Sequence, residues 1–185
     1  MKCWSIVLAC LPCCVLSAHA ESTTETAGTG VAVALPLVAG GITLWKHDWA
    51  GSAQLLTTTA LTVGTVYGMK QFLHECRPFA KPCSHNSSEW DSFPSDTSAL
   101  AFAPAQFLWQ RYGWKYGLPA YAAATFVGWS RVDTKQHHWW DVATSAAISI
   151  GYNEIFTTRF HRNREFQTNL QAAPGRVFAS VSYRW

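Results

Sequence analysis

Charged residues are scarce in this sequence, because Asp, Glu, Lys and Arg together account for 14% of its 185 residues. A soluble globular domain carries about 25%, so the composition argues against an ordinary cytosolic protein. It also excludes a disordered chain, since 49% of the residues are hydrophobic and ten are Trp. Long blocks of Lys and Arg are absent as well: the loose run 159–164 is the densest, and the net charge is +3. Nucleic acid is therefore not expected as a partner.

The N-terminus predicts a secretory signal peptide over residues 1–20. A lone Lys2 precedes an apolar stretch over residues 4–17, and the small-residue ending Ala18-His19-Ala20 predicts cleavage before Glu21. Retention as a first membrane helix is the alternative, but this stretch, at about 1.5 Å per residue, is shorter than a bilayer core of about 30 Å. We expect an exported protein that is periplasmic or associated with an inner or outer membrane.

Few cysteines remain once the signal peptide is removed. Cys3, Cys10, Cys13 and Cys14 leave with it, and Cys76 and Cys83 stay in an oxidising compartment. The segment CRPFAKPC between them holds two prolines that favour a turn, so we predict a disulfide. Two free, buried thiols are the alternative.

The remaining chain predicts one all-α domain. Residues 21–30 are small and polar and are expected to form a flexible leader. Five apolar segments separated by charged or turn-like pieces follow within residues 31–160, and they predict a bundle of five to six helices. These segments span residues 31–45, 49–73, 97–112, 116–130 and 139–157.

The tail over residues 161–185 changes period. Hydrophobic residues alternate with other residues over 176–185, directly after the turn Pro174-Gly175. This pattern predicts a C-terminal β-strand, or a hairpin together with residues 166–172.

Two arguments about membrane spanning conflict. The uncharged runs 26–45 and 49–69 are long enough to span, but the last three, 97–110, 116–130 and 142–153, are too short. The charged turns at Lys46, at Arg111 with Lys115 and at 159–164 would nevertheless all lie on one side of a serpentine path. We follow the length argument and expect buried core helices, with contact to a membrane surface left open.

Chemistry-bearing residues gather in three clusters, each at the end of an expected helix. Each cluster has an ordinary explanation when taken alone: solvated cations, a helix N-cap, or a one-turn surface pair. The clusters are Lys70 with Arg77-Pro78, then Pro94-Ser95-Asp96-Thr97, then Ser130-Arg131 with His137 and Asp141. Together and in this order, they resemble the type 2 phosphatidic acid phosphatase superfamily, which also holds bacterial acid phosphatases and vanadium haloperoxidases.

The residues in these clusters suit the handling of a phosphoryl group. His137 would attack phosphorus to give a phosphohistidine, and Asp141 would accept the other ring N–H. Cations and helix-start N–H groups would bind the phosphate oxygens; the residues expected in this role are Lys70, Arg77, Ser95 and Arg131.

The resemblance implies a phosphatase that needs no cofactor or metal. A metal site at His137, His138 and Asp141 is the alternative, but it lacks further ligands at informative spacing. The expected substrate is a phosphomonoester or a lipid phosphate or pyrophosphate. The sequence predicts no oligomeric state.

The second cluster departs from the family pattern Pro-Ser-Gly-His, in which the His protonates the leaving oxygen. Here Thr97 takes the place of that His if no gap is allowed, and Asp96 takes it after a one-residue deletion. A protonated Asp96 would serve as the general acid, whereas an ionised Asp96 would repel phosphate. Two alternatives to a phosphatase therefore stay open: a catalytically impaired relative that binds phosphate or phospholipid, and a phosphotransferase that uses the same pocket.

Overall fold

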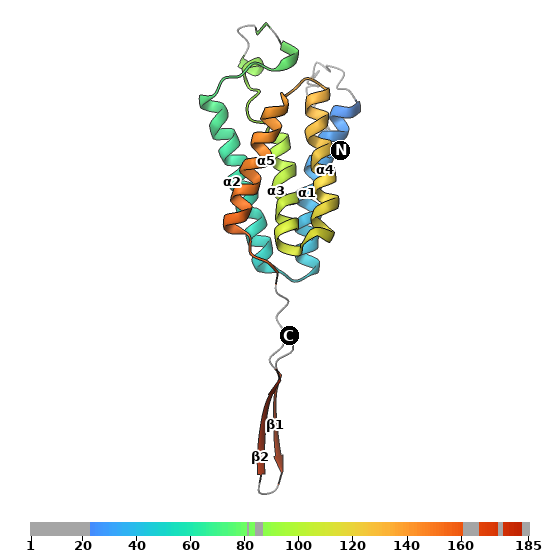
Figure 1. The fold of residues 1–185 in the computed structure, drawn as a ribbon, viewed down its shortest axis with the longest axis vertical. Coiled ribbons are helices and arrows are strands. Elements are labelled where there is room, and N and C mark those ends of the chain that lie inside the picture. Colours follow the sequence, from blue (N-terminus) through green and yellow to red (C-terminus); the bar gives the residue numbers. More distant parts are fainter. Residues whose placement is uncertain (1–22, 81, 84–86, 161–166, 174–175, 183–185) are drawn as a thin grey trace, which may run out of the picture.

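Five helices form an up-and-down bundle (Figure 1), as the apolar segments predict. The structure, a computed structural model, describes residues 23–80, 82–83, 87–160, 167–173 and 176–182. The expected signal peptide lies outside these residues. Helix α3 is central and contacts all four other helices. The helices are α1 (Thr23–Trp45), α2 (Trp49–Phe72), α3 (Asp96–Tyr112), α4 (Trp114–Asp133) and α5 (Trp139–Phe156), and two short 3₁₀ helices, η1 (Pro78–Ala80) and η2 (Ser87–Trp90), lie between α2 and α3.

The expected leader is wrong from Thr23 onward, because α1 begins there. Tertiary contacts with α4 outweigh the low helix propensity of this small, polar stretch. Gly28 packs so closely against α4 that a Cβ atom would come within 2.0 Å of Ser130 Oγ. Arg131 Nη2 also donates to the Glu25 carbonyl at 2.6 Å. These contacts hold the first turns of α1 against the end of α4.

Small residues predominate on the inner face of α1, and short polar residues on the inner face of α5. On α1 the buried positions recur every three or four residues, as expected for one face of a helix. Short side chains let the helix backbones approach closely, in the manner of small-residue interfaces in membrane bundles. The buried residues of α1 are Gly28, Ala32, Leu35, Ala39 and Thr43, and those of α5 are Asp141, Ser145, Ser149 and Asn153.

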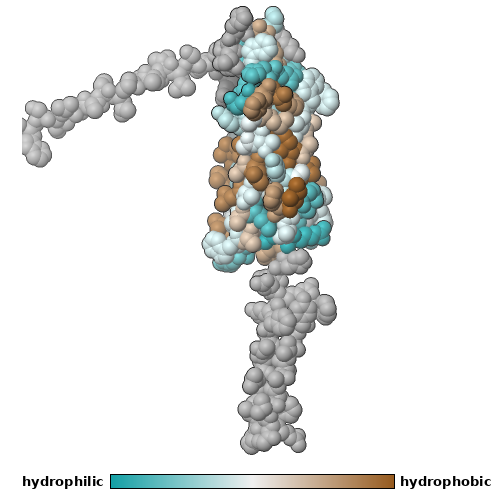
Figure 2. All heavy atoms as spheres, turned by 90° about the vertical axis from the view of Figure 1, so that its left-hand side faces the viewer, coloured by the Kyte–Doolittle hydropathy of each residue, from teal (hydrophilic) through white to brown (hydrophobic). Residues whose placement is uncertain are grey.

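Large hydrophobic side chains, in contrast, are exposed on the outer faces. The expectation of buried core helices is therefore wrong for these faces, and Figure 2 shows hydrophobic residues over the middle of one of them, with hydrophilic residues near both ends. Helices α2, α3 and α4 are also longer than their uncharged segments, since Lys70, Arg111 and Arg131 lie inside the helix ends. Helix α1 alone among the described residues is both long and apolar enough to cross a membrane. The exposed residues include Leu37, Leu44, Leu56, Leu118 and Ile155.

The C-terminal tail contains the expected hairpin. Strand β1 (Gln167–Ala173) pairs antiparallel with β2 (Arg176–Ser182), with Ala173 opposite Arg176 in the register. Figure 1 shows this hairpin extending away from one end of the bundle, the end at which α5 finishes.

A buried ion pair closes the same end of the bundle. Asp48, the N-cap of α2, accepts from Arg111 Nε at 2.6 Å and from the Tyr112 hydroxyl at 2.7 Å. A second Arg111 nitrogen, Nη1, donates to the Thr158 carbonyl at 2.7 Å. Asp48 and Arg111 are only 5% and 7% exposed. The pair therefore joins the start of α2, the end of α3 and the segment after α5 in a site with little access to water.

Replacing Arg111 should therefore destabilise the whole bundle. Arg111→Met leaves the buried carboxylate of Asp48 without its cation, and we expect the free energy of unfolding to fall by about 3–5 kcal/mol. Chemical denaturation in detergent measures this loss. Lys115→Met, at an exposed site on the same end, serves as the control and should stay within about 0.5 kcal/mol of the wild type. A loss below about 1 kcal/mol in Arg111→Met would instead mean that the pair behaves as a surface salt bridge.

Candidate active site

All three sequence clusters lie at the end of the bundle opposite the hairpin. The end of α2 carries Lys70, the start of α3 carries Asp96, and the α4–α5 connection carries His137. The long connection between α2 and α3 covers this end (Figure 1). The up-and-down path of the chain therefore brings segments that are far apart in sequence to one place.

Asp141 is the central acceptor of this end. Its side chain is fully buried, and Oδ2 accepts from Ser92 Oγ at 2.6 Å and from the His138 backbone N–H at 2.8 Å. His138 is the N-cap of α5, and the N–H groups at a helix start lack a partner within the helix. A buried carboxylate needs such donors to offset its lost hydration. Its other oxygen, Oδ1, has no hydrogen-bond partner among the described residues.

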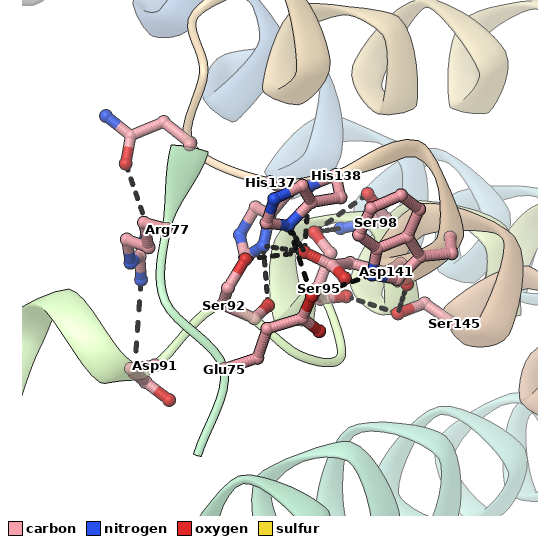
Figure 3. A network of polar contacts seen from close by, with 12 residues as sticks. Glu75, Arg77, Asp91, Ser92, Ser95, Ser98, His137, His138, Asp141 and Ser145 are labelled. Carbon is pink, nitrogen blue, oxygen red and sulfur yellow. Dashed lines mark hydrogen bonds and ion pairs between the residues drawn. The ribbon is translucent and has the colours of Figure 1, made fainter. Parts of the chain in front are cut away.

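His137 lies beside Asp141 with one ring nitrogen held between two acceptors (Figure 3). Its Nδ1 atom is 2.7 Å from the Ser92 carbonyl oxygen and 3.4 Å from Asp141 Oδ2. Both atoms accept, so Nδ1 carries the hydrogen and Nε2 keeps its lone pair. The side chain is buried, and the backbone N–H donates to the Arg131 carbonyl at 3.1 Å.

The surroundings of His137 keep its imidazole neutral. Burial lowers the pKa of His137 most, the hydrogen bond with Asp141 raises it, and the positive charges of Arg77 and Lys70 lower it further. The net result is a pKa below the ordinary value of 6.5. A neutral imidazole with a free Nε2 lone pair is a competent nucleophile near neutral pH.

Two cations share carboxylates next to this histidine. Lys70 Nζ lies 2.5 Å from Asp96 Oδ1 and 3.4 Å from Asp91 Oδ1, and it donates to the Asp91 carbonyl at 3.0 Å. Arg77 Nη2 lies 3.9 Å from Asp91 Oδ2, and Nη1 donates to Gln136 Oε1 at 2.8 Å. The Lys70 side chain is 3% exposed, whereas those of Asp91 and Asp96 are 44% and 51% exposed. The carboxylates therefore lie on the solvent side of a buried cation.

A disulfide holds the loop that carries Arg77. Cys76 and Cys83 are bonded, with their Cα atoms 6.0 Å apart. The Arg77 backbone N–H donates to the Glu89 carbonyl at 2.8 Å, and the Phe79 N–H donates to the Lys135 carbonyl at 3.1 Å. The disulfide thus fixes a short loop against the α4–α5 connection and places the guanidinium beside Gln136.

Ser95 and Thr97 lie at the start of α3. Ser95 is the N-cap, is fully buried, and its Oγ accepts from the Ser98 N–H at 3.4 Å and donates to Ser98 Oγ at 2.9 Å. Its carbonyl also accepts from Ser145 Oγ at 2.8 Å, which joins α3 to α5. Thr97 is the second residue of α3 and is half-buried. The hydroxyl of Ser95 therefore serves the helix cap in this structure.

Arg131 shares this end of the bundle, but its guanidinium turns toward α1. Besides the Glu25 carbonyl, Nη2 donates to Thr29 Oγ1 at 3.1 Å, and Nη1 lies 3.8 Å from Glu25 Oε1. Its backbone carbonyl, in contrast, accepts from His137. The expected phosphate role of Arg131 stays a prediction, because a phosphate would have to draw the guanidinium from these partners.

One group of side chains has the composition of a metal site. Ligand atoms of Glu75, His138 and Asp141 all lie within 4.8 Å of one another. These residues also have structural contacts, since Trp140 Nε1 donates to Glu75 Oε1 at 3.0 Å and the Trp140 ring stacks on His138. The residues that sequence reasoning missed in this region are Glu75, Asp91, Ser92, Gln136 and Ser145; only Ser92 carried a signal, because it directly precedes Phe93-Pro94-Ser95.

Comparison with known proteins identifies the family and the fold. The family model described as the PAP2 superfamily matches residues 51–165, a range that contains every expected site residue. A lipid A 4′-phosphatase of Helicobacter pylori is 31% identical over 163 residues, which cover 82% of this chain and 80% of that protein. The crystal structure of Aquifex aeolicus LpxE has the same fold, with a TM-score of 0.54 at 21% identity over 73% of this chain and 86% of that one.

Titration of His137 checks the electrostatics of the site. NMR of ring-labelled histidine should give a pKa below 6.5 for this residue. Arg77→Gln should raise that pKa, because a neighbouring positive charge that disfavours the imidazolium is removed. Lys115→Gln, at the far end of the bundle, is the control and should leave the pKa in place. An equal pKa in the wild type and in Arg77→Gln would show that Arg77 lies too far away or too well screened to act on His137.

Proposed function

Because the chain belongs to the PAP2 superfamily, we propose that it is a phosphatase of a lipid phosphate monoester and works through a phosphohistidine on His137. The observation that carries this proposal is the buried, neutral His137, with Nδ1 hydrogen-bonded and Nε2 free to attack. Lipid A is the substrate class that the Helicobacter pylori relative suggests.

In the proposed reaction, phosphate enters beside Lys70 and Arg77. Its oxygens take over the contacts that Asp91 and Asp96 make in the free protein, where Lys70 Nζ lies 2.5 Å from Asp96. The guanidinium of Arg77 offers parallel N–H donors to two phosphate oxygens. Both cations then offset the charge that builds on the phosphoryl oxygens as the bond to phosphorus forms.

Nucleophilic attack follows from the histidine geometry. Nε2 of His137 forms a bond to phosphorus while the bond from phosphorus to the lipid oxygen breaks. Asp141 and the Ser92 carbonyl stabilise the positive charge on the ring through Nδ1. Water then attacks the phosphohistidine, and this step releases inorganic phosphate and neutral His137.

Asp96 is the proposed general acid in place of the family's second-motif histidine. It is the first residue of α3, and its carboxyl reaches Lys70, where a phosphate oxygen would bind. Once phosphate has taken its place on Lys70, the protonated carboxyl of Asp96 would lie beside the bound phosphoryl group. It can then give its proton to the leaving lipid oxygen and take a proton from the attacking water. Thr97 lies one residue further along as a substrate contact.

An envelope membrane is the proposed location. The exposed large hydrophobic side chains on the outer helix faces would contact lipid tails, and α1, at about 1.5 Å per residue, is long enough to cross about 30 Å of hydrocarbon. A lipid phosphate held in such a membrane would present its headgroup to the end of the bundle. Export through a signal peptide would place this end outside the cytoplasm.

The direct test is phosphate release by the purified protein in detergent micelles. Lipid A, phosphatidic acid, an isoprenyl pyrophosphate and p-nitrophenyl phosphate serve as substrates, and we expect the highest kcat/KM on lipid A. His137→Ala should abolish release, because the proposed phosphoryl-enzyme forms on Nε2 of this residue. His47→Ala, at an exposed histidine of the far end, is the matched control and should keep full activity.

Three outcomes would contradict this proposal. Release that survives in His137→Ala would exclude the phosphohistidine. A folded wild type that binds vanadate without releasing phosphate from any of the four substrates would favour the phosphate-binding relative. Formation of a phosphorylated alcohol when an alcohol acceptor is added, without release of inorganic phosphate, would favour the phosphotransferase.

Asp96→Asn should separate binding from catalysis. Loss of the carboxylate frees Lys70, so KM should fall, while loss of the acid should lower kcat on lipid A by about 10²–10⁴-fold. The drop in kcat should be smaller on p-nitrophenyl phosphate, because nitrophenolate leaves without a proton. Asp91→Asn is the matched variant: it also relieves Lys70, and kcat should change only a few fold. An increase of kcat in Asp96→Asn would show that Asp96 suppresses turnover.

A further inference from the structure

Ser92 contacts both residues of the proposed nucleophilic pair. It is fully buried, its carbonyl oxygen lies 2.7 Å from His137 Nδ1, and its hydroxyl donates to Asp141 Oδ2 at 2.6 Å. Ser92 comes from the connection before α3, whereas His137 and Asp141 flank the start of α5. One residue thus joins the two sides of the site, as Figure 3 shows.

We propose that Ser92 is a positioning residue for the nucleophile: its carbonyl sets the tautomer of His137, and its hydroxyl holds Asp141 in register with the imidazole. This inference rests on the proposed function, in which His137 attacks through Nε2. Ser92 itself acts only through these two residues.

The distances favour Ser92 over Asp141 as the principal acceptor of Nδ1–H. An N–H···O bond is strongest near 2.9 Å and weak at the long end of the range, and the two acceptors lie at 2.7 Å and 3.4 Å. A backbone carbonyl cannot be protonated near neutral pH. The tautomer with Nε2 free therefore does not depend on the ionisation of Asp141 alone.

The hydroxyl of Ser92 gives the carboxylate a fixed orientation. Asp141 Oδ2 has two donors, Ser92 Oγ and the His138 N–H, and they come from different segments of the chain. With the hydroxyl removed, the fully buried carboxylate keeps the His138 N–H and the longer, 3.4 Å contact with His137 Nδ1, and it can rotate away from its present orientation. Such a turn would carry Oδ2 away from His137 and leave the imidazolium of the transition state less stabilised.

The backbone of Ser92 links this pair to the loop that carries Arg77. Its N–H donates to the Glu75 carbonyl at 3.0 Å, next to the Cys76–Cys83 disulfide. The backbone of Glu75 in turn pairs with that of Asp91 in an isolated parallel β-bridge, and the Asp91 side chain is the partner of Lys70 and Arg77. The position of the nucleophile is thereby coupled to the position of the cations that would hold its target.

Ser92→Ala tests this role against a matched buried serine. Ser149 is also fully buried, and its hydroxyl donates only to a helix carbonyl in the described contacts, so Ser149→Ala reports the cost of losing a buried hydroxyl alone. We expect kcat to fall about 10- to 100-fold in Ser92→Ala, with KM within about twofold. Ser149→Ala should keep kcat within about twofold of the wild type. Melting temperatures of both variants in detergent show whether each is folded.

The pH dependence and the tautomer give readouts that a merely structural role would not move. In Ser92→Ala the acid side of the kcat/KM profile, which reports the neutral His137 needed for attack, should shift to lower pH, because a carboxylate turned away from Nδ1 stabilises the imidazolium less. Nitrogen-15 NMR of the free wild-type protein should show hydrogen on Nδ1 of His137. Ser92→Cys, which keeps a similar volume and a weak S–H donor, should restore part of kcat and would also serve if Ser92→Ala does not fold.

Each contrary result overturns a distinct statement. Hydrogen on Nε2 in the wild type, or kcat within twofold in a folded Ser92→Ala, would overturn the positioning role while the loss of activity in His137→Ala still stood. Equal losses of kcat in Ser92→Ala and Ser149→Ala would reduce Ser92 to a packing residue. Full activity in His137→Ala would instead remove the proposed function on which this inference rests.

Discussion

The buried carboxylate of Asp141 is the constraint on which this end of the molecule depends. An ionised group with no exposure to water must be surrounded by donors, and here the donors come from Ser92 on one segment and His138 on another. The same oxygen lies 3.4 Å from His137 Nδ1. The contacts of this one carboxylate therefore cap the start of α5, anchor the connection before α3 and orient the imidazole.

The bundle supplies the rigidity that this arrangement requires. Small residues on the inner faces bring the helices close, and at the far end the Asp48–Arg111 pair joins three segments in a site where both side chains are almost fully buried. Each end of the bundle thus contains a buried acid held by donors from separate elements. The far acid is paired with a permanent cation and is structural, whereas the near acid is paired with a titratable histidine.

The sequence predicts much of the fold because the helix boundaries coincide with charged or turn-like segments. The segments 49–73, 97–112 and 139–157 agree with α2, α3 and α5 within one residue at each end. The prediction of a flexible leader is wrong from Thr23 onward because Gly28 and Thr29, two small residues, are ordered by contacts with α4. The lengths of the uncharged runs argue against membrane spanning and therefore predict buried helices. These lengths underestimate the helices, because charged residues such as Lys70 and Arg111 lie inside the helix ends.

The sequence predicts only part of the site. Motif spacing named His137 and Asp141, which do lie together, but the nearest partner of His137 Nδ1 is a backbone carbonyl, and every residue has one. Nor did spacing show that Lys70 already holds two carboxylates. Because these carboxylates are about half exposed and the ammonium is not, the ions can separate only by movement of the acids toward solvent. In the proposed reaction, phosphate binding is therefore an exchange of one anion for another, and the energy of that exchange, more than the number of cations, sets how tightly the site holds its substrate.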